Sequence, residues 1–106
     1  MIQVVITKNR GNYKGFLSRG HAGYAEEGQD IVCAAVSALV ITTANALEAL
    51  TEDRLVLDSD DGYVKWEFPD GISEKGTLLM DALVLGLTGI RDSYDKKYIR
   101  LETREV

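Results

Sequence analysis

The sequence has one cysteine and one histidine among its 106 residues. A single thiol cannot form an internal disulfide, and one cysteine with one histidine excludes a CxxC redox motif and a closed zinc site built from these residues. Scarce cysteine is also typical of a reducing compartment. We therefore expect a cytoplasmic protein with no bound metal and no cofactor.

Basic residues are also few, with 12 Lys and Arg against 17 Asp and Glu and a net charge of −5. Binding to a phosphate backbone requires a basic face, so we do not expect direct nucleic acid binding. No apolar run approaches the roughly 18–20 residues of a membrane span, and the first residues alternate like a strand rather than forming the apolar core of a signal peptide. We expect no membrane association.

The remaining composition is that of an ordinary globular domain. Hydrophobic residues make up 45% and charged residues 27% of the chain, which is close to average usage. The length suffices for one domain with its own core. We expect residues 1–106 to form a single domain without linkers or repeats.

Two hydrophobic periods alternate along the chain. Alternation in residues 2–7, 13–18, 55–57, 63–68 and 98–102 predicts strands, with turns at 9–12 and at the Asp-Gly pair of 58–62. Apolar spacings of three and four predict helices from an N-cap at Asp30 to about Leu50 and from an N-cap at Ser73 to about Ile90. The order β-β-α-β-β-α-β predicts an α+β two-layer sandwich, in which two helices cover one face of a mixed sheet.

The segment around the histidine and the cysteine contains the residues best suited to chemistry. His21 lies in a stretch with three glycines, and Cys33 follows at position N3 of the predicted helix. The thiolate is the reactive form of cysteine, and helix N-termini and nearby histidines lower the pKa of a thiol. The helix dipole contributes only about 0.3–1 kcal/mol, less than roughly one pKa unit, so the histidine would have to supply the rest.

His21 and Cys33 are therefore a candidate base and nucleophile. The alternative is structural, because a lone cysteine among Ile, Val and Ala is usually a buried small hydrophobic residue. The glycines predict that the segment of about residues 20–28 is a mobile loop that completes the site when a peptide binds.

Two further residues share a helix face with Cys33. Asp30, Cys33 and Ser37 are spaced i, i+3, i+7. Asp30 is either an ordinary N-cap or the residue that orients His21. As a cap it would occupy the Cys33 N–H and disfavour a nearby thiolate. Ser37 either hydrogen-bonds the sulfur or the substrate, or bonds back to a helix carbonyl.

The motif Gly-His-Ala-Gly-Tyr at 20–24, followed by Asp-Ile-Val-Cys-Ala at 30–34, closely resembles the signature of the ribosomal-processing cysteine protease (Prp) family. The resemblance extends over essentially the whole chain. It implies a small bacterial domain, usually a homodimer, with His21 and Cys33 as the catalytic pair and Gly20 as the hinge of a loop that moves to admit peptide. It also implies a substrate, the short N-terminal extension of a large-subunit ribosomal protein, cut after an apolar segment that contains aromatic residues.

Two other functions are compatible with the residues themselves. The first is a non-catalytic ribosomal-protein binding or assembly factor in which Cys33 is merely packed. The second is a redox sensor, although the chain has no second cysteine to resolve a sulfenic acid. Substitution of Cys33 separates these functions, because only a protease would lose turnover and keep binding.

Overall fold

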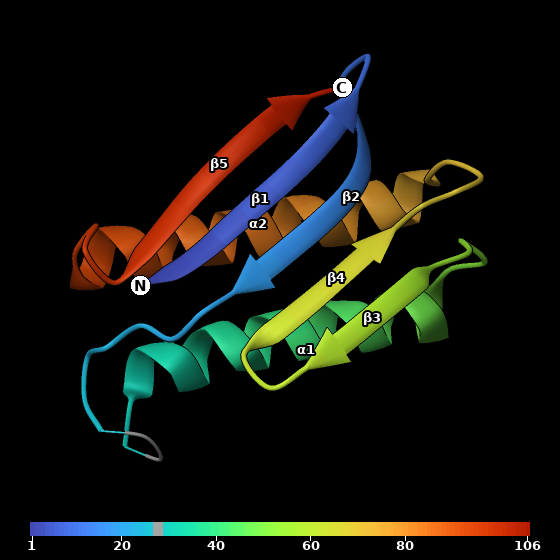
Figure 1. Cartoon of the computed structure of the whole chain (residues 1–106). Coiled ribbons are helices and arrows are strands. Elements are labelled where there is room, and N and C mark those ends of the chain that lie inside the picture. Colours follow the sequence, from blue (N-terminus) through green and yellow to red (C-terminus); the bar gives the residue numbers. More distant parts are fainter. Residues whose placement is uncertain (27–28) are drawn as a thin grey trace.

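The computed structural model describes residues 1–26 and 29–106, and its elements follow the predicted order (Figure 1). The strands and helices are β1 (Ile2–Asn9), β2 (Asn12–Arg19), α1 (Ile31–Leu50), β3 (Val56–Asp60), β4 (Tyr63–Glu67), α2 (Glu74–Tyr94) and β5 (Ile99–Glu105).

The five strands form one sheet in the order β3-β4-β2-β1-β5. β1 and β5 run parallel, whereas the other neighbours are antiparallel, so the sheet is mixed. Both helices lie on one face of this sheet (Figure 1). The predicted two-layer α+β fold is confirmed, because burying the apolar faces of the helices against the sheet gives two layers around one core.

The core lies between the sheet and the two helices. In β1, Ile2, Val4 and Ile6 are buried, as expected from the alternation along the strand. Phe16 of β2 and Trp66 of β4 stack beside them with ring centroids 4.5 Å apart. The helices contribute a matching set of fully or nearly fully buried side chains, namely Val32, Val36, Val40, Leu47, Met80, Leu83 and Leu87. Burial of each large apolar side chain contributes about 1.5–3 kcal/mol.

α1 is more continuously apolar than we expected. It contains an 18-residue window of mean hydropathy 1.8, so its length and composition are sufficient for a membrane span. The expectation that no apolar run approaches that length was wrong. A core helix passes the same test. The buried face of α1, which includes Val36, Val40 and Leu47, accounts for much of its apolar sequence.

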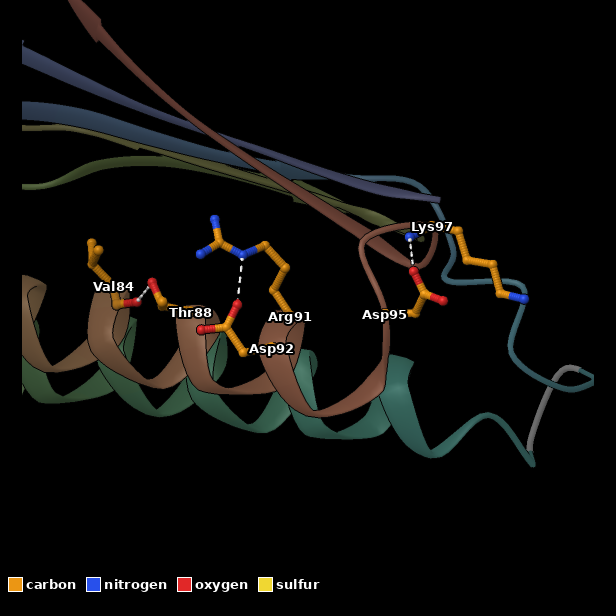
Figure 2. Close-up of polar contacts among 6 residues, drawn as sticks. All are labelled: Val84, Thr88, Arg91, Asp92, Asp95 and Lys97. Carbon is orange, nitrogen blue, oxygen red and sulfur yellow. Dashed lines mark hydrogen bonds and ion pairs between the residues drawn. The ribbon is translucent and has the colours of Figure 1, made fainter.

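α2 extends one turn beyond the predicted end at Ile90. Nothing in the sequence after Ile90 stops a helix, and the chain turns only at Asp95, which has a φ of 149° and donates its N–H to the carbonyl of Arg91. The Asp95 carboxylate accepts the N–H of Lys97 at 3.2 Å and so stabilises the turn into β5 (Figure 2). Helix ends without glycine or proline signals are hard to place from sequence.

The N-terminus of α2 is capped as predicted. The Ser73 hydroxyl accepts the N–H of Gly76 at 3.0 Å and donates to the Asp53 carboxylate at 2.8 Å. The same carboxylate accepts the backbone N–H of Ser73 at 3.0 Å. Asp53 follows α1 in the chain, so these bonds tie the end of one helix to the start of the other.

We predict that Ser73→Ala lowers the free energy of unfolding by about 1–2 kcal/mol, because it removes an N-cap and one hydrogen bond to a carboxylate. Urea titration measures this change. Ser59→Ala, on the exposed strand β3, is the matched control and should change stability by less than about 0.5 kcal/mol. Equal stability of the two variants would contradict the role of the cap.

Candidate active site

A cavity of about 570 Å³ lies where the first half of α1 meets the His21 segment and the turn between β3 and β4. It is lined by all five residues that the sequence singled out, which are Gly20, His21, Asp30, Cys33 and Ser37. Residues up to Ala25 and residues from Asp30 onward therefore line the same cavity. The predicted mobile loop includes Glu27 and Gly28, which lie outside the described residues, so its mobility stays a prediction.

Asp30 is the N-cap of α1. Its Oδ1 accepts the N–H groups of Val32 and Cys33, each at 3.0 Å, and its Oδ2 accepts the N–H of Tyr24, also at 3.0 Å. Burial alone raises the pKa of the Asp30 carboxyl, but the N–H donors of Cys33 and Tyr24 outweigh this effect and hold the pKa below its ordinary value. Asp30 is thus an anion that joins the helix start to the segment carrying His21.

Cys33 is half-buried at position N3 of α1. Its sulfur accepts the N–H of Ala22 at 3.1 Å. Burial raises the pKa of the Cys33 thiol and the negative charge of Asp30 raises it further, while the N–H of Ala22 acts in the opposite direction. The net pKa lies above the ordinary value, so the sulfur is a thiol at neutral pH and the helix dipole alone does not ionise it.

His21 is exposed and lies beside the turn between β3 and β4. Within residues 1–26 and 29–106, no hydrogen bond joins the imidazole to Cys33 or to Asp30. Hydrogen bonds between catalytic groups are often long or misaligned until a substrate binds. The relevant observation for a catalytic pair is therefore that His21 and Cys33 line the same cavity.

Ser37 lies one turn after Cys33 and is exposed at the cavity wall. In the described part of the chain its hydroxyl bonds neither to the sulfur nor to a helix carbonyl, whereas Thr43 does bond back to Leu39 at 2.7 Å. Ser37 is therefore free to meet a bound molecule.

Gly20 has a φ of +94°, and a Cβ built on it would lie 2.6 Å from the carbonyl oxygen of Met1. Only glycine fits this position, because the neighbouring atom is backbone and cannot move aside cheaply. The proposed role of Gly20 as a hinge is a separate matter and stays a prediction.

The rest of the cavity wall is mostly apolar. It includes Val36, Val40 and Ile41 of α1 and Val64 of β4, with Asp60 and Asp61 at the turn between β3 and β4. Sequence reasoning missed this turn as part of the site, because the Asp-Gly signal indicates a hairpin but not what the hairpin contacts. In the described residues no group of three or more His, Cys, Asp and Glu side chains could hold a metal ion.

A family model described as cysteine protease Prp matches residues 1–100. The chain belongs to the Prp family. The ribosomal processing cysteine protease Prp of Bacillus subtilis (strain 168) is 38% identical over 112 residues, covering 97% of each chain. The Prp of Staphylococcus aureus (strain Mu50) is 34% identical and covers 95% of this chain and 97% of its own.

Solved structures of Prp have the same fold. The S. aureus protease in complex with a covalently linked product peptide superposes with a TM-score of 0.92 at 33% identity, covering 98% of this chain and all of the other. The S. aureus protease with a substrate peptide superposes with a TM-score of 0.86 at 32% identity and the same coverage. The chain is accordingly a cysteine protease of the family involved in ribosomal processing.

We predict that Asp30→Asn lowers the pKa of the Cys33 thiol. Asparagine still caps the helix, but it removes the negative charge next to the sulfur. Alkylation of Cys33 by iodoacetamide at pH 7 should become about three to ten times faster, the size of a Coulomb effect of about 1 kcal/mol. Mass spectrometry follows this reaction cleanly because the chain has one cysteine.

The matched control is Asp70→Asn, which changes the net charge equally near Arg54, beyond the far end of α1. It should leave the rate of alkylation unchanged. A pH–rate profile of Asp30→Asn that superposes on that of the wild type would contradict the electrostatic role given to Asp30.

Proposed function

We propose that this protein removes the short N-terminal extension of a large-subunit ribosomal protein, with Cys33 as nucleophile and His21 as general base and acid. The observation that carries the proposal is the cavity that both side chains line, with the Cys33 sulfur at the start of α1. Its support is the family to which the chain belongs and the peptide complexes of the S. aureus relatives.

The raised pKa of the Cys33 thiol makes a base necessary. His21 takes the thiol proton as the sulfur attacks the scissile carbonyl carbon and forms a C–S bond. The tetrahedral oxyanion then collapses, the C–N bond breaks, and the leaving amine takes the proton from His21. A water molecule, deprotonated by His21, hydrolyses the remaining thioester and restores the thiol.

The oxyanion needs an N–H donor near the sulfur. The N–H of Cys33 itself is held by the Asp30 carboxylate at 3.0 Å. The N–H of Ala22 lies 3.1 Å from the sulfur. We propose Ala22 as a donor, because its N–H is released when the sulfur bonds to carbon and lies close to the reacting centre.

The cavity wall supports an apolar peptide segment as substrate. Val36, Val40, Ile41 and Val64 line it next to Cys33, and such a surface gains free energy by burying apolar side chains. This chemistry agrees with a cut after an apolar segment that contains aromatic residues. Ser37, exposed at the same wall, is available to hydrogen-bond the peptide backbone.

We propose further that the protein acts in the cytoplasm as a homodimer. The lone thiol suits a reducing compartment. Large apolar side chains are exposed on the helices, with Ile41 of α1 at 55%, Leu78 of α2 at 69% and Leu85 of α2 at 75% exposure. Exposed apolar side chains of this kind favour burial against a partner.

Mass spectrometry of a peptide that spans the ribosomal-protein extension tests the proposal. The wild type should cut once, after the apolar segment. Cys33→Ala should lose at least about 10⁴-fold in turnover and His21→Ala about 10²–10⁴-fold. Both variants should bind the peptide as well as the wild type does in fluorescence anisotropy.

Ser59→Ala, on the exposed strand β3, is the control and should cut at the wild-type rate. Binding by every variant without a cut by the wild type would favour the assembly factor over the protease acting on this substrate. Undiminished cutting by His21→Ala would remove His21 from the mechanism.

A further inference from the structure

The turn between β3 and β4 lies against the His21 segment. β4 pairs with β2, and Arg19 at the end of β2 stands opposite Tyr63 at the start of β4. One step further along, the N–H of Gly20 donates to the carbonyl oxygen of Gly62 at 2.9 Å. This bond extends the contact between the two strands by one residue, so the backbone is tied to the turn immediately before His21.

The His21 ring packs directly on the backbone of Gly62. A Cβ built on Gly62 would lie 2.9 Å from Nε2 and 3.3 Å from Cε1 of the imidazole. The first distance is shorter than real Cβ contacts allow, so any side chain at position 62 would displace the ring. Both residues line the cavity that contains Cys33.

The backbone before His21 has little room to move away from a side chain introduced at position 62. Gly20 is fixed on one side by its hydrogen bond to Gly62, and on the other side the carbonyl oxygen of Met1 leaves no space for a Cβ. A change at position 62 is therefore expected to move the imidazole ring rather than the segment that carries it.

We propose that Gly62 is a positioning residue for His21: the bare backbone of the β3–β4 turn sets the orientation of the imidazole toward the Cys33 side of the cavity. This inference rests on the proposed role of His21 as the base. It assigns a catalytic contribution to a hairpin turn that comes from a distant part of the sequence.

The chain offers a matched control for backbone strain. Gly62 has a φ of +66°, where an L-residue is strained whatever the surrounding space. Gly11, in the turn between β1 and β2, has a φ of +80°, and a Cβ built on it meets nothing within 4 Å. Gly11→Ala thus carries the cost of the positive φ without a contact to any side chain.

The test compares Gly62→Ala with Gly11→Ala by peptide cleavage and by NMR. His21 is the only histidine, so its imidazole gives one assigned Cε1–H cross-peak. Gly62→Ala should lower kcat/KM about a hundredfold, mainly through kcat, as expected for a catalytic group displaced by about 1 Å. It should also shift the cross-peak, whereas Gly11→Ala should match the wild type in both kcat/KM and the position of the cross-peak.

Gly62→Asn is the second variant, because asparagine tolerates a positive φ yet carries the same Cβ. It keeps the test decisive if Gly62→Ala does not fold, and it should show the same losses. Wild-type kcat/KM and an unmoved His21 cross-peak in the Gly62 variants would overturn the inference.

His21→Ala separates this inference from the proposed function. Loss of cleavage in His21→Ala with wild-type behaviour of the Gly62 variants overturns only the role of Gly62. Full cleavage by His21→Ala overturns the dyad, and the role of Gly62 falls with it.

Discussion

The Asp30 carboxylate is the interaction on which the geometry of the site depends. It accepts two N–H groups at the start of α1 and the N–H of Tyr24, so one side chain holds the cysteine helix against the histidine segment. An N-cap of this kind stabilises a helix by about 1 kcal/mol. Burial raises the pKa of the Cys33 thiol and the same negative charge raises it further, so the side chain that anchors the site also disfavours a thiolate at Cys33.

The pKa of the Cys33 thiol lies above its ordinary value, so a nucleophilic role for this sulfur requires another group that removes its proton. The N–H of Ala22 and the start of α1 favour a thiolate, but burial and Asp30 prevail over them. In the proposed mechanism, deprotonation of the thiol therefore depends on His21, and the placement of that ring matters more than it would beside a preformed thiolate. The contact between His21 and Gly62 is significant for this reason.

Local patterns predicted most of the fold, because caps, alternation and helical spacing are local properties. Asp30 and Ser73 are caps as expected, and β1 buries its alternate residues. The end of α2 was placed too early because Arg91 and the residues after it carry no stop signal. The N-cap predicted at Asp30 placed Cys33 at position N3. Whether the Asp30 carboxylate contacts His21 or only the helix start depends on distances in the folded chain, which the spacing of residues along the sequence does not give. The contact of His21 with Gly62 also depends on tertiary structure, since it arises only when β4 pairs with β2.

An affinity label tests whether the cavity brings a peptide carbonyl to the sulfur of Cys33. A chloromethyl ketone of the apolar segment, ending at the residue before the proposed cut, should modify Cys33 alone. Its rate should exceed that of chloroacetamide by about a hundredfold or more, because the bound peptide holds the electrophile at the sulfur. Equal rates for the two reagents, or modification at other side chains, would contradict the account.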